Sequence, residues 1–259
     1  MVRLTILGSG SAGNCTLIET STTRLLIDAG LSGRQIQERL AKVGRHLNEI
    51  DGILLTHEHS DHTIGLSRLC QKHDIPLYSN SLTAECLKPK LMQWKTWKFF
   101  NTGDRFSIGD WEIQSFPIPH DAYDPVGFIL HYQKVCVGFL TDLGYATRLV
   151  IERIRQCHAL LLEANHDVNL LQNDTKRPWS VKQRILSRHG HLSNEGAAQV
   201  IRDTAPQKLK HLFLGHLSSD CNQPELAHQT LRQTLDSVNA SDVKVEVAHQ
   251  TQVTTTLEL

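Results

Sequence analysis

The 259-residue sequence predicts an α/β protein in which two mixed β-sheets pack face to face with helices on the outside. Short apolar runs joined by tight turns fill the first third of the chain. Further along, helical patterns alternate with short strands, and the polar clusters follow directly after strands. No repeat, low-complexity tract or linker-like stretch interrupts the sequence, so we expect a single domain over residues 1–259.

The composition is typical of a soluble globular protein, with 40% hydrophobic and 21% charged residues. Lys and Arg together number 27, as do Asp and Glu, which excludes nucleic-acid binding through overall basicity but allows a local basic patch. No apolar run approaches the roughly 18 residues of a membrane span, and the N-terminus lacks the pattern of a signal peptide. The six cysteines form no CxxC pair. We therefore expect reduced thiols, a cytoplasmic location and no membrane contact, and leave the oligomeric state open.

The elements are predicted from apolar alternation, turn residues and helix caps. Strands are expected at 4–8, 15–19, 24–28, 52–56, 76–79, 104–108, 111–117, 126–132, 134–140, 159–163, 211–215 and 243–248. Helices are expected at 33–43, 62–73, 81–88, 148–156, 194–203 and 224–235. The turn at 8–13 is rich in Gly and Ser and could cradle a phosphate. It lacks the Lys of a P-loop and a following helix, so we predict a plain hairpin connection.

The strongest chemical signal follows the buried strand at 52–56. His57, His59, Asp61 and His62 place four candidate ligands within six residues. Because His57 and His59 are two apart, both imidazoles can point the same way on an extended segment. Imidazole and carboxylate suit Zn²⁺, Mn²⁺ or Fe²⁺ rather than Ca²⁺. The alternative is a solvated loop with incidental histidines, which fits poorly with so dense a cluster at a strand end.

Three further candidates, His120, Asp142 and His216, end later strands. Taken singly, each would be interpreted as a hydrogen-bonded terminal residue. Together with the first cluster they complete a set of seven ligands, enough for two metal ions that share one carboxylate. Two ions about 3.5–4 Å apart can clamp the attacking and leaving oxygens of a hydrolysis.

These motifs resemble those of the metallo-β-lactamase fold hydrolases, and the resemblance spans nearly the whole chain. It rests on the run at 25–30, the cluster at 57–62 and the residues His120, Asp142 and His216. Within the family, the sequence is most similar to the YycJ/WalJ group of bacterial nucleases, through the segments 8–15, 56–62, 162–167, 190–194 and 214–218. The resemblance implies an αββα sandwich with metal ions at one edge, between the sheets.

The resemblance also implies a role for each position. His57, His59 and His120 would hold one divalent ion, and Asp61, His62 and His216 would hold the other. Asp142 would bridge the two ions, which would be Zn²⁺ or Mn²⁺, with iron as a further candidate. Asp28 would support the metal-binding loop, in line with the general need to orient ligating imidazoles.

Differences from other members narrow the choice within the family. True β-lactamases carry Cys in place of Asp142, and flavodiiron reductases carry Glu in place of His59. RNase J-type enzymes have a large domain inserted between the last two ligand motifs, which this chain lacks. Glyoxalase II shares the ligand set and is harder to exclude, although it has a C-terminal helical region for its thioester substrate.

His191 precedes the predicted helix at 194–203, and a helix N-terminus is a suitable place to meet a phosphate. In phosphodiesterase members of the family, a histidine in a similar His-Leu-Ser context contacts the scissile phosphate. The alternative is a histidine that only caps the helix or hydrogen-bonds locally. Glu163 and His166 follow a buried strand and resemble an acidic supporting position of nuclease relatives; a purely structural role is equally open for both.

A run of cations leads into His191: Lys176, Arg177, Lys182, Arg184 and Arg188. We predict that it contacts the phosphates of a nucleic acid, with a merely solvated face as the alternative. A second stretch, at 88–98, combines Lys and Trp. Its Trp residues could stack on bases or pack in the core, and the second outcome is the more usual.

The sequence therefore predicts a binuclear metal-dependent phosphodiesterase with Asp61 and His191 as catalytic residues. By resemblance, the substrate would be double-stranded DNA, cleaved as a 5′→3′ exonuclease. The nearest alternative is a small-molecule phosphodiesterase acting on cyclic or short phosphodiesters. A one-metal iron oxygenase or a non-enzymatic nucleic-acid-binding module agrees less well with a complete ligand set.

Overall fold

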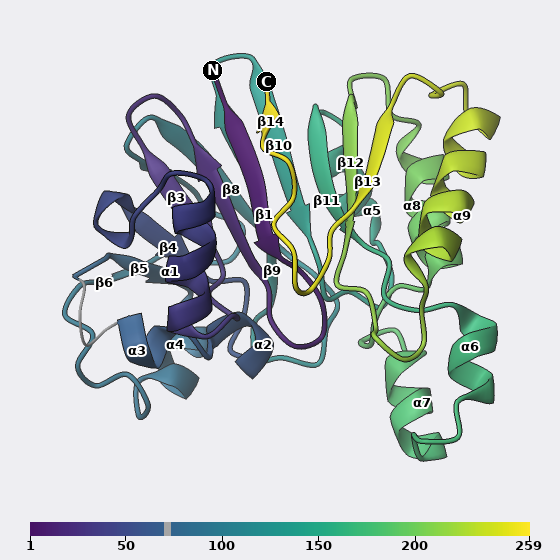
Figure 1. Ribbon diagram of the computed structural model, residues 1–259, viewed down its shortest axis with the longest axis horizontal. Helices are drawn as coiled ribbons and strands as arrows, with labels where there is room; N and C mark the ends of the chain where they lie inside the picture. Colours follow the sequence, from purple (N-terminus) through teal and green to yellow (C-terminus); the bar gives the residue numbers. More distant parts are fainter. Residues whose placement is uncertain (70–73) are drawn as a thin grey trace.

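Two seven-stranded β-sheets pack face to face in the computed structural model, which describes residues 1–69 and 74–259 (Figure 1). The first sheet, in the order β14-β1-β2-β3-β4-β5-β6, contains β1 (Arg3–Gly8), β2 (Cys15–Glu19), β3 (Arg24–Ile27), β4 (Gly52–Leu54), β5 (Leu77–Ser79), β6 (Trp97–Phe99) and β14 (Leu257–Glu258). The second, in the order β13-β12-β11-β10-β9-β8-β7, contains β7 (Arg105–Ile108), β8 (Trp111–Pro117), β9 (Val126–Tyr132), β10 (Val135–Leu140), β11 (Ala159–Glu163), β12 (His211–Gly215) and β13 (Lys244–Val247).

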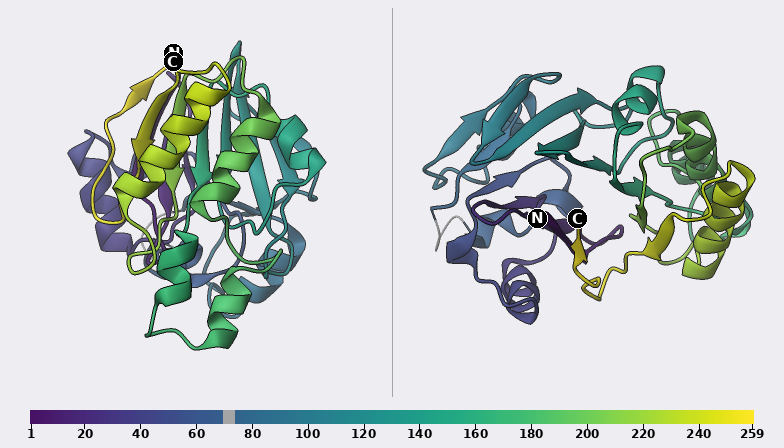
Figure 2. Two further views of the ribbon diagram at one scale, coloured as in Figure 1. Left: turned by 90° about the vertical axis from the view of Figure 1, so that its right-hand side faces the viewer. Right: turned by 90° about the horizontal axis from the view of Figure 1, so that it is seen from above.

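Helices cover the outer faces of both sheets and complete four layers (Figure 2). They are α1 (Gly33–Lys42), α2 (Ser60–Thr63), α3 (Leu66–Leu69), α4 (Ser81–Leu87), α5 (Arg148–Ile154), α6 (Val168–Asn173), α7 (Trp179–Ile185), α8 (Asn194–Thr204) and α9 (Pro224–Ser237), with a 3₁₀ turn at Leu47–Glu49. The α1 helix lies on the first sheet, whereas α5, α8 and α9 lie on the second (Figure 1). None of the helices in the described part of the chain is both long and apolar enough to cross a membrane.

Alternating strand residues explain why the layers form. Ile6 of β1 points into the core between the sheets, whereas its neighbour Leu7 packs with α1. In β11, Leu161 faces the first sheet and Leu162 faces the helices. Three apolar clusters thus fill the three interfaces between four layers, as expected where successive side chains point to opposite faces of a sheet.

The fold class predicted from the sequence is confirmed, and the differences lie in short elements. The helix expected at 62–73 is divided into α2 and α3, because Gly65 approaches the backbone of 29–31 too closely for a continuous helix; residues 70–73 lie outside the described part. Four elements were not expected: β6, α6, α7 and β14. The last of these pairs antiparallel with β1, where Arg3 lies opposite Glu258.

Candidate metal centre

The predicted ligands gather at one end of the sandwich, in loops that follow four different strands. The cluster from His57 to His62 follows β4, whereas His120, Asp142 and His216 follow β8, β10 and β12. The first cluster belongs to one sheet and the other three residues belong to the second sheet. The seven side chains form two groups, in each of which all ligand atoms lie within 4.8 Å of one another.

In the first group, three imidazoles face one another. His59 Nδ1 and His120 Nε2 are 3.3 Å apart, and the rings of His57 and His59 are 4.6 Å apart. His57 is fully buried, and its Nε2 has no hydrogen-bond partner among the described residues. A buried polar atom without a partner costs free energy. This unpartnered nitrogen lies in one group with ring nitrogens of His59 and His120, which is an arrangement that fits a bound cation.

In the second group, Asp142 lies between the imidazoles. Its Oδ2 is 3.1 Å from His62 Nε2, and its Oδ1 is 3.2 Å from His216 Nε2. The same Oδ1 is 3.8 Å from His120 Nε2, so this carboxylate reaches toward the first group as well. Asp61 completes the set, with its Oδ2 3.1 Å from His216 Nε2. The geometry is that of a carboxylate shared between two neighbouring sites.

Three of the acidic and imidazole residues have strained backbone conformations. Asp28, Asp142 and His216 have left-handed φ angles of 61°, 60° and 56°. Such a conformation costs of order 1–3 kcal/mol for a residue with a side chain and clusters at functional sites. Each of the three follows directly after a strand or nearly so, where the turn redirects the side chain into the cluster.

The ring nitrogens that point away from the cluster have their own partners. Asp28 Oδ2 accepts from His62 Nδ1 at 2.7 Å and also from the Thr56 hydroxyl, which is 2.9 Å from His57 Nδ1. His120 Nδ1 donates to the Gly190 carbonyl at 3.2 Å. Fixing Nδ1 in this way holds the ring and leaves Nε2 for the cluster. Asp28 thus occupies the supporting position that the resemblance implies.

Burial and charge act differently on the two groups. Burial lowers the pKa of His57 and of His120. It opposes the charged form of His62 and His216 too, but Asp142 and the other carboxylates beside each ring together outweigh it and raise the pKa of both. Hydrogen bonds from these two imidazoles lower the pKa of Asp61 in spite of its burial. A divalent cation that binds these imidazoles would displace their protons, and its positive charge would replace that of the imidazolium groups.

His191 lies beside the second group, with its ring stacked on His216 at a centroid distance of 5.3 Å. Its Nδ1 donates to Glu163 Oε1 at 2.7 Å, and Glu163 Oε2 accepts from the Leu143 backbone amide at 2.9 Å. Burial opposes the charged form, but the carboxylate raises the pKa of His191. The pKa of Glu163 falls to about 2, because His191 and its hydrogen bond outweigh burial. Glu163 therefore orients His191 and favours its charged form.

His166 has a different environment. Its side chain is buried, and burial lowers its pKa to about 4. Its backbone carbonyl accepts from Asn194 N at 2.9 Å, which ties the end of β11 to the start of α8. The His166 ring itself contacts Asn165 through Nδ1 at 3.3 Å, and its buried Nε2 has no hydrogen-bond partner among the described residues.

A supporting network that sequence reasoning did not assign centres on Asn14. The Asn14 amide donates to the Asp61 carbonyl at 2.8 Å, and Asn14 Oδ1 accepts from Ser9 Oγ at 2.9 Å. Ser9 Oγ in turn accepts from His216 N at 2.8 Å. The Gln250 side chain accepts from Ala12 N at 2.9 Å and donates to the carbonyl of residue 13 at 2.8 Å. The turn at 8–13 does connect two antiparallel strands, but it also braces the cluster.

The basic run is largely engaged in contacts within the protein. The sequence predicted that Lys182 contacts a phosphate. Instead, Lys182 is buried and its Nζ donates to the Gln172 carbonyl at 2.8 Å, so the ammonium group is not presented to a substrate. Lys176 and Arg177 each pair with Asp220 at 3.0 Å, and Arg177 also pairs with Asp174 at 2.8 Å.

The last two cations of the run lie closer to the cluster. Arg184 pairs with Asp121, which follows His120, and the Arg188 guanidinium lies 4.3 Å from the centroid of the Tyr145 ring. Both side chains therefore contact loops that carry predicted ligands. Of the Trp residues in the stretch 88–98, Trp94 packs in the core and Trp97 donates to Ser79 Oγ at 2.8 Å.

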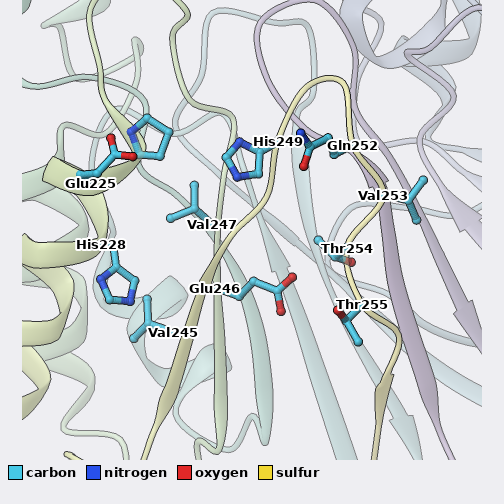
Figure 3. Close-up of a pocket in the computed structure, with 11 residues that line it drawn as sticks. Glu225, His228, Val245, Glu246, Val247, His249, Gln252, Val253, Thr254 and Thr255 are labelled. Atoms are coloured by element: carbon cyan, nitrogen blue, oxygen red, sulfur yellow. The ribbon is translucent and has the colours of Figure 1, made fainter.

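Outside the cluster, a hollow lies beside the C-terminal strands. A cavity of about 640 Å³ lies between α9, β13 and the segment 249–255 (Figure 3). Glu225 and His228 of α9 line it from one side, and Glu246 of β13 lines it from another. None of the predicted site residues takes part in its lining.

The chain belongs to the beta-lactamase superfamily, whose domain model matches residues 23–216. It is 38% identical over 237 residues to exodeoxyribonuclease YycJ of Bacillus anthracis, covering 91% of this chain and 89% of that protein. It is 39% identical over 233 residues to exodeoxyribonuclease WalJ of Streptococcus pneumoniae serotype 2, covering 88% of this chain and 86% of the relative.

Solved structures show the same fold at lower sequence identity. The metallo-beta-lactamase fold protein YhfI from Bacillus subtilis superimposes with a TM-score of 0.70 at 18% identity, covering 98% of this chain and 100% of that one. Zn²⁺-bound PqqB from Methylobacterium extorquens gives a TM-score of 0.73 at 16% identity, covering 99% of this chain and 100% of that one.

Proposed function

We propose that this protein is a metal-dependent phosphodiesterase that degrades DNA as a 5′→3′ exonuclease on double-stranded substrate. The observation that carries the proposal is the assembly of seven imidazole and carboxylate side chains, Asp142 among them, with the His191 ring stacked on His216. The names of the exodeoxyribonuclease relatives support DNA as the substrate.

The donor set fits two divalent ions, Zn²⁺ or Mn²⁺, with iron as a further candidate. His57, His59 and His120 would hold one ion, and Asp61, His62 and His216 would hold the other, with Asp142 shared. When bound, such a pair lowers the pKa of water and offsets negative charge on a phosphoryl group. The unpartnered Nε2 of His57 and the short distances to Asp142 support this division of the ligands.

The catalytic roles follow from position and charge. Asp61 is ionised and partly exposed at the edge of the cluster, so its carboxylate would orient the attacking water and accept its proton. His191, held by Glu163, would donate a hydrogen bond from Nε2 to a phosphoryl oxygen as negative charge develops there. Both groups are fixed before the substrate binds, which limits the reorganisation that the reaction requires.

One set of assays tests the activity and its main alternatives together. Purified protein with Mn²⁺ or Zn²⁺ is incubated with duplexes labelled at either the 5′ or the 3′ end, a cyclic nucleotide and a thioester. We expect stepwise shortening of the duplex from its 5′ end and no turnover of the thioester. Hydrolysis of the cyclic nucleotide without cleavage of the duplex would instead establish the small-molecule alternative, and thioester turnover alone would indicate a glyoxalase II-like activity.

A further inference from the structure

A helical arm projects past the end of the sandwich that carries the metal cluster (Figures 1 and 2). The arm, residues 168–185, consists of α6 and α7 and follows β11. Contacts within the protein brace it: Lys182 Nζ bonds the Gln172 carbonyl, and Arg177 pairs with Asp174 and Asp220. These buried or paired cations hold the two helices in a fixed arrangement, so whatever α7 exposes has a defined position.

The C-terminal end of the arm is attached to the loop that carries His120. Arg184 pairs with Asp121, and the Asp121 amide donates to the His189 carbonyl at 3.0 Å. The chain then reaches Gly190, whose carbonyl holds His120 Nδ1. A substrate strand at the metal cluster would therefore lie next to the base of α7 and could follow this helix outward.

Trp179, the first residue of α7, presents most of its side chain to solvent. It is 61% exposed, whereas Trp94 is 8% exposed and Trp111 is fully buried. The side chains of Lys176 and Arg184 are 74% and 64% exposed on the same arm. An exposed aromatic ring on the same arm as exposed cations matches single strands of nucleic acid, in which bases stack on rings and phosphates meet cations; a phosphate would replace Asp220 as the partner of Lys176.

We propose that Trp179 stacks on an unpaired base of the DNA substrate a few nucleotides from the scissile phosphate, with Lys176 beside the adjoining phosphate. The inference rests on the proposed nuclease function. The seven residues of α7 span about 10 Å at 1.5 Å per residue, which is the rise of about three stacked nucleotides. Trp179 is therefore a substrate-positioning residue that a dinucleotide or a small diester does not reach.

Intrinsic fluorescence tests the contact without requiring cleavage. Metal-loaded protein is titrated with a single-stranded 12-mer whose phosphorothioate linkages resist hydrolysis. We expect quenching of Trp emission that the Trp179→Phe variant loses while it still binds the strand. The Trp179→Ala variant should bind about 5-fold or more weakly, the low end of the loss expected for one base–aromatic stack. Val181→Ala, 38% exposed on the same helix, is the matched control and should bind like the wild type.

Activity measurements complete the test. Trp179→Ala should raise KM for long overhanging duplexes and leave hydrolysis of bis-p-nitrophenyl phosphate unchanged. Equal loss on both substrates would overturn the proposal, since the arm would then act by supporting the metal loop. Unchanged strand binding by Trp179→Ala would also overturn the proposal, and a contact with a protein partner would then be the remaining role for the exposed ring. Quenching by the strand in a protein that cleaves no diester would contradict the nuclease function and leave the strand contact intact.

Discussion

At the scale of single residues, the cluster depends on the hydrogen-bond partners that hold its imidazole rings. His62 is held by Asp28, His120 by the Gly190 carbonyl, and His191 by Glu163. Each partner fixes one ring nitrogen, so the other is directed to the cluster before any ion or substrate binds. The chemistry therefore rests as much on these hydrogen bonds as on the ligands themselves.

Asp61 is the residue whose replacement tests the proton transfer. We expect Asp61→Asn to lower turnover on a phosphodiester by about 10²–10⁴-fold, the usual contribution of a general base, because the amide accepts no proton. Thermal unfolding and circular dichroism should show an intact fold. Ser60→Ala, at the exposed neighbouring position, serves as the control. Turnover near the wild-type value would remove Asp61 from the proposed mechanism.

His191 separates substrate chemistry from metal binding. We expect His191→Ala to lower turnover by roughly 10²–10³-fold, as for the loss of one donor that stabilises developing charge, while metal content stays close to that of the wild type. Glu163→Gln should lower turnover too, since the neutral amide no longer holds His191 as a cation. Metal analysis alongside kinetics decides the matter: if metal content falls as steeply as activity, His191 is a ligand.

The sequence predicts the candidate ligands and, through the resemblance, Asp28 and Glu163 as supporting groups, but not the other groups that contact them. His57, His59, Asp61 and His62 stand out because they are chemically distinctive and adjacent. Asn14, the Gly190 carbonyl and Gln250 could not be found in this way, because amides and backbone carbonyls are common and their contacts depend on the tertiary fold. Their functional meaning appears only when distant segments are brought together.

At the scale of elements, long or strongly alternating segments were predicted well and short ones were not. The strand at 159–163 is a continuous, fully buried run, and the helix at 224–235 has clear helical periodicity over its length. By contrast, β14 is a pair of residues ordered by β1 at the other end of the chain, and α6 and α7 are short polar helices held by Lys182 and Arg177. Local patterns carry little information about such elements, because tertiary contacts decide them.

The C-terminal segment 248–256 offers an element-scale test, since it reaches the cluster through Gln250. We expect Gln250→Ala to lower the free energy of unfolding by about 0.5–1.5 kcal/mol, because its side chain loses one exposed and one partly buried hydrogen bond to the turn. It should also weaken metal binding. The turn at 8–13 leads directly to Asn14, whose backbone amide donates to the Asp61 carbonyl, so a looser turn would loosen the backbone of Asp61. Urea unfolding and a metal titration measure the two effects. Gln252→Ala, an exposed position in the same segment, should change neither; weakened stability with unchanged metal affinity would show that the brace does not extend to the cluster.

At the scale of the whole molecule, the cluster lies across the junction of the two sheets. One sheet supplies the residues after β4, and the other supplies His120, Asp142 and His216. Bound ions would therefore crosslink the two halves of the sandwich. Anything that binds the folded state alone stabilises it, by about 2.7 kcal/mol at a concentration of 100 times Kd.

The size of that stabilisation should increase with pH. Burial opposes the charge, but Asp142 and the other carboxylates beside each ring together raise the pKa of His62 and His216 in the folded protein above 6.5, the ordinary value. In chelator these two imidazolium groups contribute stability that is complete below pH 6.5 and is lost as the pH rises through the raised pKa. His57 and His120 have lowered pKa values, so they are neutral in both states above pH 6.5 and do not oppose this loss.

We therefore expect the Tm in chelator to fall as the pH rises above 6.5, because the unfolded imidazoles then release their protons while His62 and His216 of the folded protein still bind theirs. Ligated imidazoles carry no proton, so the Tm with saturating Mn²⁺ should hold steady, and the difference between the two curves should widen with pH. Scanning fluorimetry at several pH values measures both curves. His228→Gln, remote from the cluster on α9, should leave both profiles unchanged. Parallel curves would mean that metal binding does not replace the protons of His62 and His216, and the assignment of these residues as ligands would fail.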